Sequence, residues 1–128
     1  MKEEPEKYGF DDLVKDKRRA WTKVKNYQAR NYIREMKKGD HVLFYSSGKT
    51  KAVVGIAKVV SNGSYPNPED DTWSCVDIAP VKKLKTEVSL ADIKADKFFS
   101  ELKLIKQSRL SVVPVEKDHF DKLVAMGA

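Results

Sequence analysis

Basic and aromatic residues are concentrated in one part of the sequence, where their combined chemistry suits a nucleic acid. Residues 15–38 contain ten Lys and Arg residues together with Trp21, Tyr27 and Tyr32. Cations attract phosphates, and aromatic rings stack on bases. The chain has 25 Lys and Arg against 19 Asp and Glu, a net charge of +6, which favours the same class of partner. A solvated helix face explains the charge alone equally well.

The first two turns of a predicted helix within this stretch have an unusual density of hydrogen-bonding side chains. Asn26, Tyr27, Gln28, Arg30 and Asn31 lie there, while the apolar residues of the helix recur at helical spacing and predict one buried face. Asn26 is a good N-cap. Capping does not explain Gln28 and Asn31, so we expect a binding surface at this end. The free backbone N–H groups and the helix dipole there also attract anions.

Residues able to catalyse a reaction or bind a metal are sparse. Cys75 lies in an apolar predicted strand, where a thiol is far more often a packing residue than a nucleophile. His41 and His119 have no metal-ligand or triad partner nearby in the sequence. Two histidines and one cysteine do not supply a typical zinc site. We therefore expect no catalysis, no metal and no cofactor.

Hydrophobic patterning predicts the elements that position these residues. The first helix should have Phe10, Leu13 and Val14 on one side, and Pro80 should lie at a bulge or a sheet edge. Such elements predict an α+β fold built on a curved, mainly antiparallel sheet or a small barrel. The predicted helices are 9–17, 26–38 (stopped by Gly39), 89–96 and 116–127; the predicted strands are 41–47, 52–60, 72–84 and 110–115, with a loop at 61–71.

The length and composition fit a single domain spanning residues 1–128. The sequence has no secretory signal and no apolar run of the roughly 18 residues that a membrane span needs. Its lone cysteine cannot form an internal disulfide. We expect a cytoplasmic protein without a membrane partner, and the pattern does not predict an oligomeric state.

Five ordered segments resemble the EVE domains of the PUA-like superfamily. The segment WTKVKNYQARNYIREMKKGD resembles the family signature W-x-x-V-[RK]-N-Y-Q-A-R-N. The segments VLFYSS, VVGIAKVV, SYPNP and QSRLSVVPV resemble further EVE motifs in the same order, so the resemblance covers almost the whole chain. Trp21, the hairpin and SRLSVVPV are more distantly similar to YTH domains, which bind N6-methyladenosine in RNA.

The resemblance implies a PUA-like barrel and a pocket for a modified base, of the cytosine or adenine class, in DNA or RNA. The base would be flipped into a pocket with an aromatic wall and a polar edge. Trp21 is the expected wall, with Tyr45 or Tyr65 as a second; a core tryptophan is the alternative for Trp21. The other expected base-pocket residues are Asn26, Tyr27, Gln28, Asn31, Ser46 and Ser108.

Four basic residues are expected to contact phosphate or to brace the pocket: Lys23, Lys25, Arg30 and Arg109. A buried structural role is an equal alternative for Arg109.

The chain departs from the EVE pattern at two places. Family members begin with an aromatic-rich strand that ends K-S-E-P, whereas this chain starts MKEEP, so we expect a truncated first strand or an open barrel edge. Glu3 replaces the serine, and Ser46 stands where the family often has histidine. Two rivals to a non-catalytic reader remain: a small-ligand or protein-interaction module using the same pocket, and a base-modifying or nuclease-associated enzyme.

Overall fold

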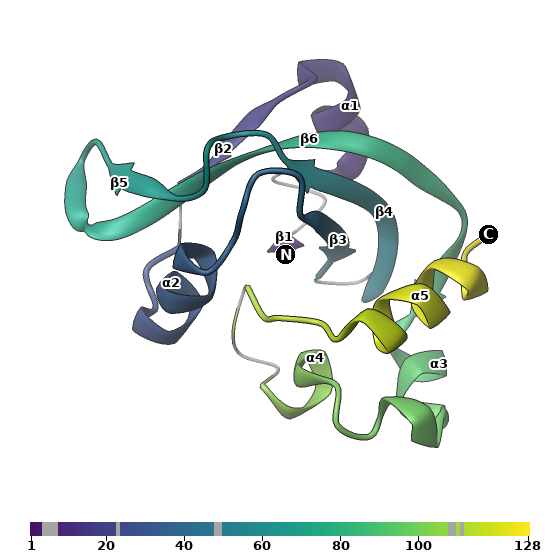
Figure 1. Ribbon diagram of the computed structural model, residues 1–128. Helices are drawn as coiled ribbons and strands as arrows, with labels where there is room; N and C mark the ends of the chain where they lie inside the picture. The colour runs from purple at the N-terminus through teal and green to yellow at the C-terminus, as the bar shows by residue number, and fades with distance from the viewer. Residues whose placement is uncertain (4–7, 23, 48–49, 108–109, 111) are drawn as a thin grey trace.

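The fold is built on a curved sheet of six strands (Figure 1). The computed structural model describes residues 1–3, 8–22, 24–47, 50–107, 110 and 112–128. The strand order is β1-β3-β4-β6-β2, and β5 pairs with β6 outside this path. Only the β1–β3 pair is parallel among the described pairs; the others are antiparallel. The strands are β1 Lys2–Glu3, β2 Arg19–Trp21, β3 His41–Ser46, β4 Ala52–Val59, β5 Tyr65–Asn67 and β6 Asp70–Ser89.

The long strand β6 gives the sheet its curvature, because it pairs with β2 and β5 toward its start and with β4 along the rest. Its register with β4 shifts between Ile56 and Ala57, the residue that faces Pro80. A proline has no N–H to donate, so a strand tolerates it best at such an irregularity. The predicted position of Pro80 at a bulge is confirmed.

The helices cover the two faces of this sheet. In Figure 1, α3, α4 and α5 gather on one side, while α1 lies on the other side and α2 lies beneath the β5–β6 end. The helices are α1 Phe10–Asp16, α2 Tyr27–Arg34, α3 Leu90–Ala95, α4 Lys103–Lys106 and α5 Lys117–Met126, with a 3₁₀ helix at Lys97–Phe99.

Two apolar clusters result, one on each face of the sheet. Val42 and Phe44 of β3 belong to the cluster that α1 and α2 cover, while Leu43 and Tyr45 belong to the cluster that α3, α4 and α5 cover. This division follows from the alternation of side chains along a strand.

The predicted α+β fold with a mainly antiparallel, curved sheet is confirmed, as are most of its helices and the β3–β4 hairpin. Four details of the prediction are wrong. The described residues of 110–115 form no strand, and the loop predicted at 61–71 contains β5. Val14 is exposed rather than packed beside Leu13. Helix α2 also ends at Arg34, before the stop predicted at Gly39.

Candidate nucleic-acid interface

Helix α2 begins at the position that its sequence predicts. Asn26 is extended, with a φ of −120°, and its Oδ1 accepts hydrogen bonds from the backbone N–H groups of Gln28 at 2.9 Å and Ala29 at 3.1 Å. Ala29 and Ile33 are fully buried against the sheet. The opposite face of the first turns is therefore turned toward solvent.

An aromatic pair forms beside the first turn of α2. Tyr27 is 62% exposed, and its ring centroid lies 5.1 Å from that of Trp73, on β6, with an angle of 35° between the ring planes. Lys25 Nζ lies 5.7 Å from the Trp73 ring centroid, and the Arg30 guanidinium lies 4.9 Å from the Tyr27 centroid. We call Lys25, Tyr27, Arg30 and Trp73 the aromatic patch.

The aromatic patch is held in place by hydrogen bonds between α2 and β6. The Arg30 guanidinium donates to Asn31 Oδ1 at 3.1 and 3.2 Å and to the backbone oxygen of Thr72 at 3.1 Å. Arg34 Nε donates to Ser74 Oγ at 2.9 Å. Arg30 and Asn31 thus brace the surface on which Tyr27 and Trp73 lie.

Gln28 faces a different part of the molecule. Its Nε2 donates to the Tyr32 hydroxyl at 3.1 Å, and that hydroxyl donates to Gln107 Oε1 at 3.0 Å. This chain of bonds ties α2 to the residue immediately before the predicted site residues Ser108 and Arg109. Both of these, and Lys23, lie outside the described residues.

Trp21 is packed in the interior, at the end of β2. It is 6% exposed, it pairs with Val76 of β6, and its ring meets Phe44 edge to face with centroids 5.8 Å apart. This is the packing of a core tryptophan. The next residue, Thr22, accepts a hydrogen bond from the Asn67 side chain at 3.0 Å, which ties β2 to β5.

Tyr45 and Ser46 are also buried, but Tyr45 lies on the opposite face of β3 from the Trp21 contact. Burial raises the pKa of the Tyr45 phenol. Trp21 and Tyr45 therefore do not face one another as two walls of one slot.

The other predicted second wall, Tyr65, lies in a hydrogen-bonded network. Its hydroxyl donates to Asp77 Oδ1 at 2.5 Å, while the Arg18 guanidinium donates to Asp77 Oδ2 at 2.6 and 3.1 Å. Burial and the bond to Asp77 raise the pKa of Tyr65 to about 12. Burial alone would raise the pKa of Asp77, but the bonds from Tyr65 and Arg18 outweigh it and lower that pKa.

Two of the residues considered for catalysis, Cys75 and His119, are buried. Cys75 is buried, and burial raises the pKa of its thiol, which keeps it protonated. His119 is buried, with Nε2 3.0 Å from the backbone oxygen of Phe98. Within the described ranges, no three His, Cys, Asp or Glu residues are grouped to hold a metal ion, and no helix is long and apolar enough to cross a membrane.

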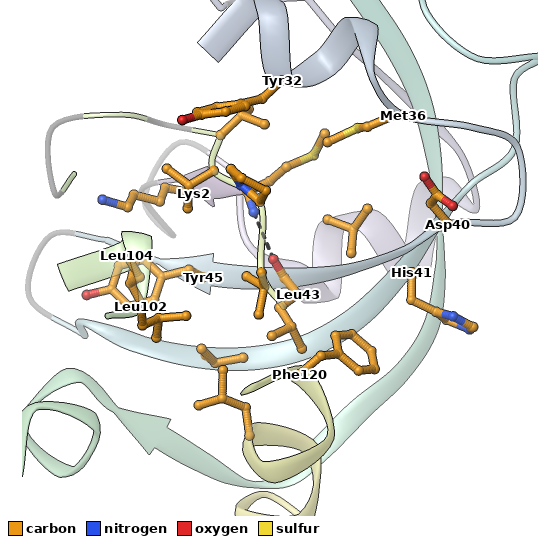
Figure 2. A pocket seen from close by; sticks show the side chains of 18 of the residues that line it. Lys2, Tyr32, Met36, Asp40, His41, Leu43, Tyr45, Leu102, Leu104 and Phe120 are labelled. Atoms are coloured by element: carbon orange, nitrogen blue, oxygen red, sulfur yellow. Dashed lines mark hydrogen bonds between the residues drawn. The ribbon is translucent and has the colours of Figure 1, made fainter. Parts of the chain in front are cut away.

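A separate cavity of about 760 Å³ opens beside β3, away from the aromatic patch (Figure 2). We call it the β3 groove. Figure 2 shows Tyr32 and Met36 of the α2 region on one side of Leu43 and Phe120 of α5 on the other, with Lys2 at one end and Asp40 at the opposite end.

Trp73 is the site residue that sequence reasoning missed. It lies in the predicted strand 72–84, to which the sequence analysis assigned no binding role. The sequence signal that could have found it is the run of acidic and small polar residues just before it, which marks the exposed start of β6.

A curved, mainly antiparallel sheet with short helices and a basic, aromatic surface at the start of α2 defines an α+β domain of the predicted class. The chain belongs to the EVE domain family, because the family model described as EVE domain matches residues 1–126. This confirms the resemblance seen in the sequence.

Relatives of known structure or name are similar over nearly the whole chain. Thymocyte nuclear protein 1 of Mus musculus is 32% identical, covering 98% of this chain and 71% of its own length. A crystal structure from Agrobacterium tumefaciens is 38% identical with a TM-score of 0.94, covering 99% and 90% of the two chains. Human THYN1 in complex with 5-methylcytosine-containing DNA is 28% identical with a TM-score of 0.89, covering 99% and 95%.

Proposed function

We propose that this domain is a non-catalytic nucleic-acid-binding module that reads a modified base, of the cytosine or adenine class. The observation that carries the proposal is the human THYN1 complex with 5-methylcytosine-containing DNA, whose fold matches 99% of this chain. The basic, aromatic surface at the start of α2 supports it independently, because it has the chemistry that a nucleic acid requires.

In this proposal the aromatic patch contacts the nucleotides on either side of the base that is read. The exposed Tyr27 ring is available to stack on a neighbouring base, and Lys25 lies beside Trp73 to meet a phosphate. Arg30 already donates three hydrogen bonds within the protein. Its role is therefore to hold the aromatic patch in place rather than to bind a phosphate through two parallel hydrogen bonds. Glu69, Asp70 and Asp71 would repel phosphates from the β5–β6 turn and direct the strand toward α2.

The read base enters beside the amino end of α2. In our proposal Trp21, whose ring is buried against Phe44, supports this entry from the interior. Ser108 and Arg109, which lie outside the described residues, stay predicted contacts of the base. Flipping a base out of its stack costs least in a single strand, so single-stranded sites should bind better than matched duplexes.

A binding panel tests the proposal. Fluorescence anisotropy at physiological salt should be measured with DNA and RNA oligonucleotides that carry 5-methylcytosine, oxidised methylcytosine, N6-methyladenine or no modification. We expect one modified class to bind at least tenfold more tightly than its unmodified match. Trp21→Phe should reduce this ratio while preserving a cooperative thermal transition.

Two results would refute the proposal. One is that no oligonucleotide binds more tightly than heparin, a generic polyanion, at the same salt concentration. The other is a change in the mass of the modified oligonucleotide after incubation with the protein, which would establish an enzyme instead of a reader.

A further inference from the structure

One stripe of helix α2 runs along the start of strand β6. Tyr27, Arg30 and Arg34 are spaced at i, i+3 and i+7, which places them on the same side of the helix. Each of the three contacts one of residues 72–74 at the start of β6, beside which α2 lies in Figure 1. We call Tyr27, Arg30, Arg34 and residues 72–74 the α2–β6 seam. The seam continues the aromatic patch toward the carboxyl end of α2.

The two arginines of the seam differ in how much of the guanidinium is engaged. Arg30 donates hydrogen bonds from Nε, Nη1 and Nη2. Arg34 donates from Nε to Ser74 Oγ at 2.9 Å, and within the described ranges its two Nη groups have no protein partner. The Arg34 side chain is exposed, whereas Ser74 is only 6% exposed. A buried hydroxyl therefore anchors one edge of the Arg34 guanidinium and leaves the other edge to solvent.

A guanidinium anchored in this way suits a phosphate. The two Nη groups form a planar edge that matches two phosphate oxygens, so they can donate two parallel hydrogen bonds. The bond to Ser74 already restricts the side chain, which reduces the conformational entropy lost when a ligand binds. The acidic neighbour Glu35 lines the β3 groove instead of the seam.

The spacing along α2 relates this phosphate position to the exposed Tyr27 ring. Seven helical residues at about 1.5 Å each separate Tyr27 from Arg34 by roughly 10 Å. Stacked nucleotides rise by about 3.4 Å each. A base on Tyr27 and a phosphate at Arg34 would thus belong to nucleotides about three positions apart.

We propose that Arg34 binds a backbone phosphate of the nucleic acid, about three nucleotides from the base that stacks on Tyr27. This inference rests on the proposed function and deepens it, because it gives the strand a path from the amino end of α2 along the α2–β6 seam. Ser74 is a positioning residue in this site, since its hydroxyl holds the guanidinium of Arg34.

Methylphosphonate scanning of a single-stranded oligonucleotide with one modified base tests the inference. Each substitution replaces one charged phosphate by a neutral group, and fluorescence anisotropy measures binding to the wild-type protein and to Arg34→Gln. We expect one linkage at which the substitution weakens wild-type binding at least threefold but leaves the binding of Arg34→Gln unchanged. At the other linkages the two proteins should lose affinity equally.

Salt dependence separates a phosphate contact from a purely structural role. Arg34→Gln should reduce the slope of log affinity against log salt by about 0.7, the value for one phosphate of a single strand. Lys94→Gln, which removes an exposed charge on α3, is the matched control and should leave the slope unchanged. Ser74→Ala and Arg34→Lys both keep the charge, so they should keep the slope but weaken binding about two- to fivefold, because the anchored planar edge is lost.

The possible failures are distinguishable. If Arg34→Gln and the wild-type protein both bind the oligonucleotide and lose affinity equally at every linkage, the inference is overturned while the proposed function stands. An unchanged salt slope in Arg34→Gln, with a cooperative thermal transition retained, has the same consequence. If no oligonucleotide binds the wild-type protein more tightly than heparin does, both the inference and the proposed function fail.

Discussion

The two tryptophans of this chain lie in contrasting surroundings. Trp21 is 6% exposed and packs edge-on against Phe44 in the interior. Trp73 is half-buried on β6, stacks near the exposed Tyr27 and has Lys25 over its ring. The family signature begins at Trp21, yet the accessible aromatic surface is built around Trp73. A motif residue can therefore serve mainly to fix the element that follows it, while an unremarkable strand position supplies the contact surface.

The largest expected effect follows removal of the interior ring. Trp21→Ala should lower the free energy of unfolding by about 3–5 kcal/mol, because it leaves a cavity beside Phe44. Urea denaturation followed by circular dichroism measures this loss. A loss below about 1 kcal/mol would mean that Trp21 is not a core residue and would remove the contrast between the two tryptophans.

Removal of the Trp73 ring should weaken nucleic-acid binding more than it lowers stability. Trp73→Ala should cost only about 1 kcal/mol of stability but weaken oligonucleotide binding roughly fivefold to a hundredfold, because base stacking on an aromatic surface contributes about 1–3 kcal/mol. Phe98→Ala is the matched control, since Phe98 is an exposed aromatic residue, 46% accessible, outside the aromatic patch. Equal binding by the two variants would show that the aromatic patch does not contact the nucleic acid.

A single charge should have a smaller effect, visible chiefly in its salt dependence. Lys25→Ala should weaken binding about two- to fivefold and reduce the slope of log affinity against log salt by about 1, as expected for loss of one phosphate contact. Lys94→Ala removes an exposed charge on α3 and should leave the slope unchanged. An equal slope change in both variants would indicate attraction by net charge alone.

The smallest effect concerns the hydrogen bond between Tyr65 of β5 and Asp77 of β6. Asp77→Asn should lower the pKa of Tyr65 from about 12 toward its ordinary value of 10, because the carboxylate no longer holds the phenol proton. Since the folded-state pKa is raised, this phenol contributes stability below pH 10 that is lost as the pH rises toward 12. Absorbance titration near 295 nm, with Tyr65→Phe as the reference, measures the change. An unchanged titration would show that burial alone raises the Tyr65 pKa.

Local sequence signals predicted much of this fold. The Asn26 cap, the aromatic and β-branched content of β3 and the Ser89 cap of α3, whose Oγ accepts from the Asp92 N–H at 3.1 Å, each depend on neighbouring residues. Residues 110–115 have strand-forming side chains, and Leu110 and Val112 are buried, but the described part of that segment has no sheet partner. Strand pairing depends on distant residues, so composition alone could not decide it.

The candidate site was harder to predict, for a physical reason. Spacing along α2 correctly indicated that Ala29 is buried and Tyr27 exposed. It could not show that β6 brings Trp73 to within 5.1 Å of Tyr27, because that contact joins residues 46 positions apart. Burial of Tyr45 on the face opposite Trp21 likewise depends on the register of β3 in the sheet.

The most direct test of this account of the interface is a ¹⁵N NMR titration with a single-stranded oligonucleotide that carries the preferred modified base. We predict amide shifts at Asn26–Arg30 and at residues 72–74, around the aromatic patch, with those at His41–Leu43 and Phe120 unchanged. Shifts confined to the β3 groove, with Tyr27 and Trp73 unaffected, would contradict the account.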